Sequence, residues 1–541
     1  MLTPLAHGVI ALAAAISSTP PDHERPAQLD WAECPESAGI GDWPELGARL
    51  RCAQADMPLD HRQPDGRTVM VDIVRVLAAD PARREGSIFF NIGGPGGYPG
   101  AALPSLAAGW LDPGPGGTPE RDKQRLAERF DLVAVVPRGL GAAWRYDCLT
   151  PLQPTARFLP THRDDANWQR TLDDARREAA ACRDTLGARS INTEQHVRDM
   201  DHVRRAIGDE RIHFYGISHG ALVGAWYAAT FPAHMGRMLL DSPFYFRHNY
   251  QTATVLSLEA ERRLFERDIL APVIAAPAAY GLALEGDDIQ PTLWRMPGEL
   301  REAWHDRLVS PMHLATALAM QAWVAHDGWK GWVALSAMAE RRPFARDPVL
   351  SASLRTAARQ LLMPASAPGP MLPPYRFSAH HRAKRPAGVL IGAPSDSVWI
   401  ATLCNDGPWW GTEAAIRARA DHFALNFWEA DGTDIAPYLV CSRWGGHAVD
   451  KPDMDVIATG PAFLMLQSED DVPTPARGSE ALLAYYPNAH LVMARGSDLH
   501  GLFNASGTPC IERAAARFLL TGELPNAPGR RTECRMDAVT P

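Results

Sequence analysis

The sequence predicts an α/β fold: a mostly parallel, doubly wound sheet with a large, mainly helical cap domain inserted between two core strands. Two observations point to it. Near both ends of the chain, short apolar runs alternate with helical patterns, as in sheets whose parallel strands are joined by helices. Between these regions lie about 200 residues in which helical patterns dominate, which is too long for a loop.

The first 140 residues of the chain supply three strands. Residues 67–77 alternate apolar and polar side chains, which is typical of a strand. Residues 86–92 and 129–139 contain continuous apolar runs, which indicate strands buried on both faces. The first run ends in "GGPGG" and the second in Pro-Arg-Gly, so a glycine-containing turn follows each strand. Residues 192–208 then show the apolar spacing of a helix.

The same alternation continues through the middle of the chain and resumes near its end. "RIHFYGIS" (211–218) is expected to be a strand, 219–232 a helix that Pro232 ends, and 236–243 another strand. The later units are two strand-to-loop segments over 461–471 and 489–501 and a closing helix over 510–522.

These patterns divide the chain into four parts. Residues 1–28 are expected to be a signal peptide or a disordered tail, and residues 29–244 the N-terminal part of the core. The cap domain covers residues 245–455, which contain ten of the 16 tryptophans. Residues 456–541 complete the core. The cap is expected to lie over the C-terminal edge of the sheet, where ligands bind in open α/β sheets.

Composition and charge narrow the classes of function. Hydrophobic residues make up 46% and charged residues 22%, as in ordinary folded soluble proteins. The net charge of -9, with scattered basic residues, argues against nucleic acid as a partner, and no apolar run is long enough to span a membrane. An apolar stretch over 9–16 resembles a secretory signal peptide, although no basic residue precedes it. A disordered tail or a misassigned start is the alternative.

The cysteines also favour a secreted or periplasmic location. None of the eight lies in a C-x-x-C pair or has the spacing of a zinc site. They follow one another as four sequential pairs, which an oxidising compartment would join as local disulfides, although eight cysteines allow 105 connectivities. Eight buried free thiols are the alternative. The cysteines are Cys34, Cys52, Cys148, Cys182, Cys404, Cys441, Cys510 and Cys534.

The pentapeptide "GISHG" indicates the nucleophile. Ser218 stands between a predicted strand and a predicted helix, with Gly216 and Gly220 two residues to either side. A serine on such a strained strand-to-helix turn is exposed for attack, and the turn requires small neighbours at these positions. The alternative is a small residue in an ordinary tight turn.

The glycine loop "NIGGPGG" (91–97) predicts an oxyanion hole. Gly94 is the expected backbone donor, with Gly93 as the alternative, and the N–H of His219 is expected to be the second donor. The other interpretation, a phosphate-binding loop, lacks the spacing and the lysine of a P-loop.

The remaining catalytic residues are expected after late strands, in the order serine, acid, histidine. The first of these strands offers Asp470 and Asp471, and the second offers His500. The segment between them has room for one helix and one strand, which fits the expected order of elements. A lone histidine in a solvated loop is the alternative for His500.

Together these segments resemble the secreted tripeptidyl-aminopeptidase branch of the prolyl-aminopeptidase-like α/β hydrolases, from about residue 34 to residue 534. "NIGGPGGYPG", "RIHFYGISHG", "LQSEDDVPTPARG" and "GSDLHG" are similar to that family's loop, elbow, acid and histidine blocks. The resemblance implies the α/β-hydrolase fold, selects Asp471 over Asp470, and supports export and sequential disulfides. Three departures near the site are Val136 in place of an acid, "GISHG" in place of the usual elbow, and Tyr98-Pro99 in place of Ser-Gly.

The expected protein is therefore a serine hydrolase, by resemblance an exopeptidase acting on peptides with a free N-terminus through an acyl-enzyme. Asp406 of "CNDGPWW" is a candidate partner for the substrate ammonium, with a structural role as its alternative. No metal, organic cofactor, nucleic acid or membrane is expected, and a monomer is compatible with the sequence. The same chemistry on a non-peptide ester, amide or lactone is the second hypothesis, and a non-catalytic binding protein is the third.

Overall fold

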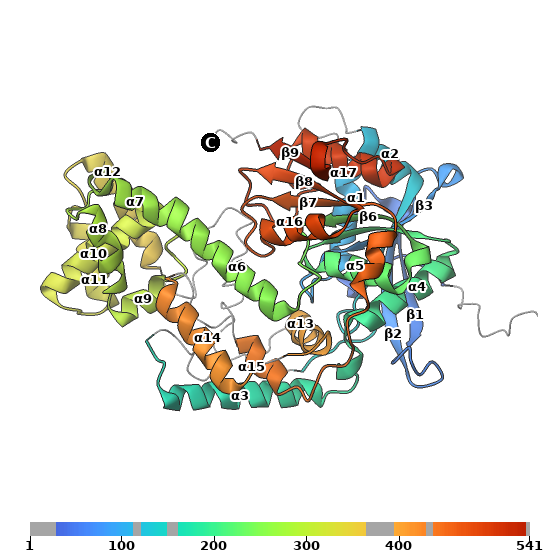
Figure 1. Cartoon of the computed structure of the whole chain (residues 1–541), viewed down its shortest axis with the longest axis horizontal. Helices are drawn as coiled ribbons and strands as arrows, with labels where there is room; N and C mark the ends of the chain where they lie inside the picture. Colours follow the sequence, from blue (N-terminus) through green and yellow to red (C-terminus); the bar gives the residue numbers. More distant parts are fainter. Residues whose placement is uncertain are drawn as a thin grey trace, which may run out of the picture.

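A nine-stranded sheet organises the part of the molecule that lies at the right of Figure 1. The computed structural model describes residues 29–111, 121–148, 161–363, 394–409, 411–428 and 436–536, and the predicted signal peptide lies outside these ranges. The strand order is β1-β2-β4-β3-β5-β6-β7-β8-β9, antiparallel among β1, β2 and β4 and parallel from β4 to β9. The strands are β1 (Leu50–Pro58), β2 (Thr68–Val76), β3 (Gly86–Asn91), β4 (Phe130–Val135), β5 (Ile212–Ile217), β6 (Met235–Asp241), β7 (Phe463–Ser468), β8 (Ala489–Arg495) and β9 (Arg531–Arg535).

Helices cover both faces of this sheet, which explains the continuous apolar runs of its central strands. One face shares a hydrophobic cluster with α4, α5 and α16. The other shares a cluster with α1, α2 and α17. These helices are α1 (Pro99–Leu111), α2 (Arg121–Arg129), α4 (Thr193–Ile207), α5 (His219–Thr230), α16 (Ala476–Tyr485) and α17 (Pro509–Thr521).

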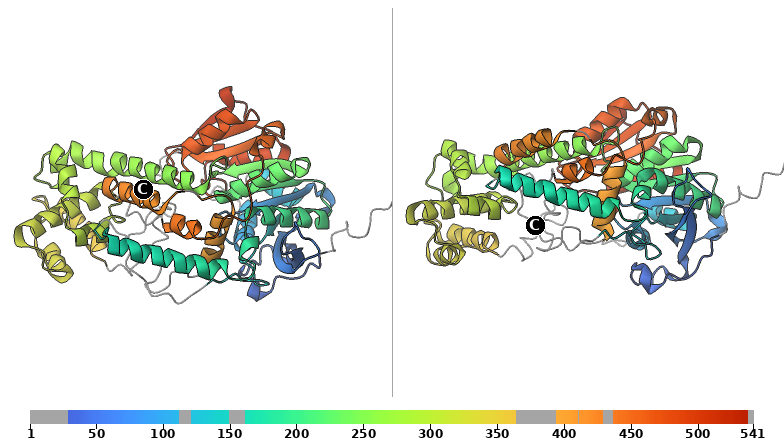
Figure 2. Two further views of the ribbon diagram at one scale, coloured as in Figure 1. Left: turned by 60° about the horizontal axis from the view of Figure 1, so that its bottom comes forward. Right: turned by 90° about the horizontal axis from the view of Figure 1, so that it is seen from below.

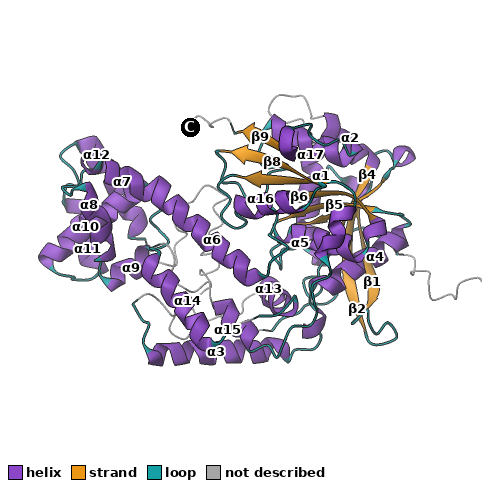
Figure 3. Ribbon diagram, viewed as in Figure 1, coloured by secondary structure: helices purple, strands orange, loops and turns teal. Residues whose placement is uncertain are grey.

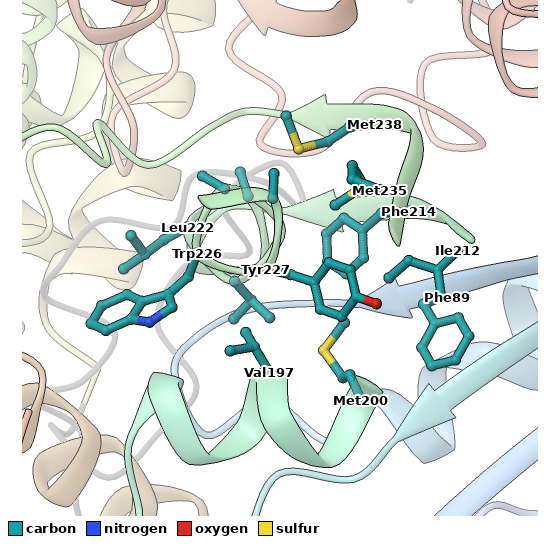
Figure 4. Packing of buried hydrophobic residues seen from close by; sticks show 14 of the residues in the cluster. Phe89, Val197, Met200, Ile212, Phe214, Leu222, Trp226, Tyr227, Met235 and Met238 are labelled. Carbon is teal, nitrogen blue, oxygen red and sulfur yellow. The ribbon is translucent and has the colours of Figure 1, made fainter. Parts of the chain in front are cut away.

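Helix α5 is packed between the sheet and α4, as Figure 4 shows. Its sequence is apolar on all sides, as expected of a helix that solvent does not reach, and Trp226 and Tyr227 are fully buried. The helix approaches the sheet closely because Gly224 has no side chain: a Cβ there would lie 2.5 Å from the ring of Phe214. Burial of each large side chain stabilises the packing by about 1.5–3 kcal/mol.

The rest of the chain forms a helical body beside the sheet (Figures 1 and 2). It contains one hydrophobic cluster around α10, and a second cluster, where α3 packs against α13, α14 and α15, also includes Val136 and Leu140 of the segment after β4. Its helices are α3 (Asp165–Arg183), α6 (Tyr250–Leu264), the π-helical turn η7 (Phe265–Leu270), α7 (Ala271–Ala275), α8 (Gly286–Trp294), α9 (Gly298–Trp304), α10 (Pro311–Asp327), α11 (Trp332–Arg341), α12 (Pro348–Leu361), α13 (Pro394–Asn405), α14 (Glu413–Asn426) and α15 (Ala436–Ser442).

The predicted fold class is confirmed, with helices and strands distributed as Figure 3 shows. Three features differ from the sequence patterns. Strands β1 and β9 were not predicted, because both lie at the edges of the sheet and contain charged residues that mask the apolar alternation. Helix α3 lies between β4 and β5 in the chain, within the predicted core segment, yet it packs on α15 of the predicted cap segment.

Four disulfides cross-link the described residues, and each joins neighbours in the order of the cysteines. Their Cα–Cα distances run from 4.7 to 5.9 Å, within the usual range. Over the described ranges, the search for an apolar helix of membrane-spanning length finds no candidate. The pairs are Cys34–Cys52, Cys148–Cys182, Cys404–Cys441 and Cys510–Cys534.

Candidate active site

Ser218 occupies a sharp turn between β5 and α5. Its φ of 60° and ψ of -123° lie where non-glycine residues rarely occur, which is the backbone strain expected of a nucleophile at such a turn. The turn closes because two glycines lack side chains: a Cβ on Gly216 would collide with the carbonyl oxygen of Gly220, and one on Gly220 with that of Asn91. The two glycines of "GISHG" are thus required by the geometry of the turn.

The glycine loop after β3 lies directly against this turn. A Cβ on Gly93 would collide with the carbonyl oxygen of Ile217 and would lie 2.9 Å from the N atom of His219. The Gly93 N–H donates to Asn91 Oδ1 at 2.9 Å, so it is already used. In the described parts of the chain the N–H groups of Gly94 and His219 have no such partner, which favours these two as oxyanion donors.

Asn91 is itself held by a buried histidine. Its Nδ2 lies 3.2 Å from Nε2 of His196. Burial lowers the pKa of His196 to about 4, so the ring is neutral at pH 7 and its Nε2 accepts from the amide. Burial also lowers the pKa of His219 to about 3, so its side chain is a neutral ring that stacks on Tyr250 rather than a second charged base.

Asp471 and His500 face one another across the loops that follow β7 and β8. The Nδ1 of His500 lies 3.1 and 3.0 Å from the two carboxylate oxygens of Asp471, whose side chain is buried. The N–H of Thr474 donates to Oδ1 of Asp471 at 3.0 Å and holds the carboxylate in place. Burial alone would lower the pKa of His500, but the charge and hydrogen bond of Asp471, with a smaller contribution from Asp241, raise it above its ordinary value.

Asp470, the alternative acid, points away from this pair. Its carboxylate accepts two hydrogen bonds at 2.9 Å from Arg267 of η7. The structure therefore separates the two neighbouring acids: Asp471 contacts His500, whereas Asp470 links the acid loop to the helical body.

The serine turn and the histidine loop meet next to these residues. A Cβ on Gly501 would lie 3.3 Å from Cγ2 of Ile217, so the residues adjacent to His500 and Ser218 are in contact. The three side chains predicted from the ends of three separate strands are thus brought to one edge of the sheet, where parallel α/β sheets place their ligands.

A mostly apolar pocket opens beside the turn. Phe244, whose N–H donates to the Ser218 carbonyl at 3.2 Å, forms part of its wall. Asp406 also lines it, but both carboxylate oxygens accept hydrogen bonds from Thr193, at 2.8 and 2.6 Å. Burial raises the pKa of Asp406 to about 7, although the hydrogen bonds from Thr193 lower it. The other lining residues are Leu222, His248, Asn249, Tyr250, Gln251, Leu403, Gly407, Pro408, Trp409 and Lys451.

Sequence reasoning missed the polar residues that support the site. Asn91, Asp241, Ser242 and Thr474 are all nearly or fully buried and hydrogen-bonded to site loops. One signal was available for Asp241: an acidic residue ends the apolar run "MLLD", where its charge needs several partners. Among the described residues, no three His, Cys, Asp or Glu side chains are placed to hold a metal ion.

Comparison with known proteins agrees with this geometry. Residues 124–267 match the family model described as "alpha/beta hydrolase fold", and residues 430–534 match the one described as "TAP-like protein". The tripeptidyl aminopeptidase of Streptomyces coelicolor is 26% identical over 518 residues, which cover 92% of this chain and 84% of that protein.

Two mycobacterial proteins match shorter parts. The serine protease Hip1 of Mycobacterium tuberculosis is 26% identical over 219 residues, or 39% of each chain. Carboxylesterase B of M. tuberculosis is 32% identical over 228 residues, covering 40% of this chain and 39% of its own. The sheet topology and the two family matches show that this chain has the α/β-hydrolase fold, with a TAP-like C-terminal segment, and the chain is similar over nearly its whole length to a tripeptidyl aminopeptidase.

Proposed function

We propose that this protein is a serine exopeptidase that releases short N-terminal peptides or residues from peptides through an acyl-enzyme. The observation that supports it most strongly is the buried Asp471–His500 pair beside the strained serine turn, in a chain similar over 92% of its length to a tripeptidyl aminopeptidase.

In the proposed reaction, Ser218 Oγ attacks the carbonyl carbon and His500 takes its proton, while Asp471 orients the imidazole and stabilises the imidazolium. The N–H groups of Gly94 and His219 bind the oxygen that becomes negatively charged. The carbon–nitrogen bond then breaks, and His500 gives its proton to the leaving amine. Water, deprotonated by His500, attacks the ester and releases the acid and free Ser218.

The pocket beside the turn is proposed to receive the N-terminal part of the substrate. Its apolar walls suit side chains, and Asp406 supplies a carboxylate for an ammonium group. Because the Asp406 pKa is about 7, we expect this carboxylate to bind a cation more weakly as the pH falls below 7. Its bonds to Thr193 would persist, so a bound ammonium would share the carboxylate with that residue.

A panel of four substrates tests the proposal: a tripeptidyl anilide with a free N-terminus, its N-acetylated counterpart, an aminoacyl anilide and a simple ester. We expect kcat/KM for the free tripeptidyl anilide to exceed that of the acetylated one by at least about tenfold, or about 1.4 kcal/mol. Asp406→Asn should remove that preference without affecting the ester. Turnover of the ester alone, or equal rates on both tripeptides, would exclude the exopeptidase.

The second candidate is the same chemistry on a non-peptide ester. Two observations favour it: the pocket walls are largely apolar, and carboxylesterase B is 32% identical over part of the chain. The same panel separates the two candidates, because an esterase would turn over the ester and neither tripeptide.

We also propose that the protein acts outside the cytoplasm, secreted or in a periplasm. Four disulfides, with no free cysteine among the described residues, support this, because such bonds form and persist in oxidising compartments. Fractionation of the producing cell, with a mass map of the unreduced protein, tests it. Protein retained in the cytoplasm with free thiols would contradict it.

A further inference from the structure

Two adjacent residues, Asp241 at the end of β6 and Ser242 directly after it, contact three segments of the candidate site: the serine turn, the acid loop and the histidine loop. Both are completely buried, and neither belongs to the proposed triad. Ser242 also has a φ of 48°, so two residues with this rare backbone conformation, Ser218 and Ser242, lie close together at this edge of the sheet.

Their contacts with the histidine loop are the most extensive. The carboxylate of Asp241 accepts the N–H of Leu502 at 2.9 Å and that of Phe503 at 2.8 Å. Ser242 Oγ accepts the N–H of Gly501 at 2.9 Å. Three consecutive backbone donors directly after His500 are therefore fixed by two adjacent side chains at the end of β6.

The same pair also holds the serine and the acid loops. The carbonyl oxygen of Asp241 accepts the N–H of Ser218 at 2.9 Å. The carbonyl oxygen of Ser242 accepts the hydroxyl of Thr474 at 2.9 Å, and Thr474 in turn donates its N–H to Asp471. One dipeptide thus connects the backbone positions of all three residues of the proposed triad.

We propose that Asp241 and Ser242 are positioning residues, which fix the loop of His500 relative to Ser218 and Asp471 and so keep the imidazole in its productive orientation. This inference rests on the proposed function, because it assigns a role in the same reaction. It also explains a costly burial: among the described residues no basic side chain pairs with the Asp241 carboxylate, which accepts two backbone N–H groups and the hydroxyl of Tyr215 at 3.1 Å.

The substitution Asp241→Asn tests the carboxylate. Oδ2 of Asp241 accepts from Phe503, Leu502 and Tyr215, whereas Oδ1 accepts only from Leu502. An asparagine can keep one acceptor, but its NH₂ group would then face the Leu502 N–H as donor against donor. The histidine loop has to shift, and a displacement of about 1 Å in a reacting group costs on the order of 100-fold in rate.

Glu512→Gln is the matched control. Glu512 is also buried, and its carboxylate accepts a backbone N–H of the same loop, that of Asn504. In the described part of the chain its other partners are Ser506 and Lys123, and it forms no bond with Ser218, His500 or Asp471. If loop stability alone mattered, Glu512→Gln and Asp241→Asn would have similar effects on turnover.

The experiment measures kcat and KM per active site, with sites counted by a fluorophosphonate that labels Ser218. We expect Asp241→Asn to lower kcat by about 10- to 100-fold with KM within twofold of wild type, Ser242→Ala to lower it by about 3- to 10-fold, and Glu512→Gln to leave both unchanged. The labelling rate should fall in parallel with kcat, because it depends on the same histidine.

Folded Asp241→Asn and Ser242→Ala with wild-type kcat per site would overturn the proposal, as would equal losses in Glu512→Gln. If Asp241→Asn does not fold, Ser242→Ala decides the question alone. A wild-type protein that the fluorophosphonate does not label would overturn the proposed function, and this inference with it. If the wild-type protein is labelled but kcat of the variants is unchanged, only this inference is overturned and the proposed function stands.

Discussion

At the scale of single residues, His500 is the group whose charge determines when the site is active. The base must be neutral to take the proton of Ser218. Its pKa is raised above the ordinary 6.5, because the effects of Asp471 and Asp241 outweigh that of burial. A raised pKa keeps the imidazole of His500 protonated up to a higher pH. As the pH is lowered, activity is therefore lost at a higher pH than it would be with an isolated histidine.

We therefore expect kcat/KM to rise with pH through a midpoint above 6.5. Asp471→Asn should move this midpoint to lower pH and decrease kcat by about 10²- to 10⁴-fold, the usual contribution of a positioned acid–base group. A pH–rate profile of both proteins measures this. An unchanged midpoint in Asp471→Asn would show that this carboxylate does not act on the base.

A second prediction at this scale concerns Gly93. Gly93→Ala places a methyl group against the backbone of the serine turn and should lower kcat by at least about 100-fold. Gly208 is the matched control, since its φ of 89° is almost the same as the 88° of Gly93 and its surroundings are open. Gly208→Ala should cost about 1–2 kcal/mol of stability and leave kcat unchanged. Equal activity in both variants would contradict the proposed oxyanion loop.

The site residues could be predicted because catalysis allows only certain residue types at certain places in the fold. Only small residues fit beside Ser218, and the order of strands fixed where an acid and a histidine could lie. Asp241 and Ser242 were missed because their role depends on which strand lies beside β7 in the sheet. That pairing joins residues 225 positions apart and leaves no local pattern in the sequence.

At the scale of elements, η7 of the helical body is tied to the acid loop by Arg267 and Asp470. Asp470 precedes Asp471, so this bidentate pair connects the two parts of the molecule at a residue adjacent to the site. Because the arginine is about half exposed, the pair is screened by salt and stabilises the fold by less than about 1 kcal/mol.

We expect Arg267→Ala to reduce kcat/KM by about two- to fivefold at low salt, a difference of up to about 1 kcal/mol, and the difference should vanish at high salt. Arg359→Ala is the control, because Arg359 forms a similar bidentate pair with Glu340 within the outer helices. Measuring kcat/KM of both variants from low to high ionic strength tests this prediction. Identical salt dependence in the two variants would show that the pair next to Asp471 has no special effect.

At the scale of the whole molecule, the two faces of the sheet and the helices around α10 have hydrophobic clusters of their own, whereas the cluster of α3, α13, α14 and α15 also includes the segment after β4. The pocket lies where the sheet and the helical body meet. Helix α5, which packs on the sheet, lines one side, and the segment after α13 lines another. Cys404, which lies two residues before Asp406, forms a disulfide with Cys441 and so joins α13 to α15. This disulfide therefore supports one wall of the pocket from within the helical body.

We expect the double substitution Cys404→Ala and Cys441→Ala to destabilise the protein by about 2–4 kcal/mol and to raise KM for peptides. The pair Cys34–Cys52, at the edge strand β1, is the control: its removal should lower the melting temperature and leave KM unchanged. Calorimetry and steady-state kinetics measure the two effects. An unchanged KM without Cys404–Cys441 would contradict the assignment of this pocket to the substrate.

The overall architecture was predictable because alternation of strands and helices is a strong periodic signal. Which segments form the helical body was not predictable, and α3 is the example. Its segment lies between two core strands in the sequence, and its apolar face alone does not indicate which surface it covers. Only the complementary face of α15, more than 250 residues away, determines that it joins the helical body.

The central claim, that Ser218 is the nucleophile, is tested most directly by labelling the full-length protein with a fluorophosphonate and mapping the added mass. We expect one adduct per chain, on the peptide that contains Ser218, and no adduct in Ser218→Ala. An adduct of the same yield in Ser218→Ala, or a wild-type adduct on another residue, would contradict it.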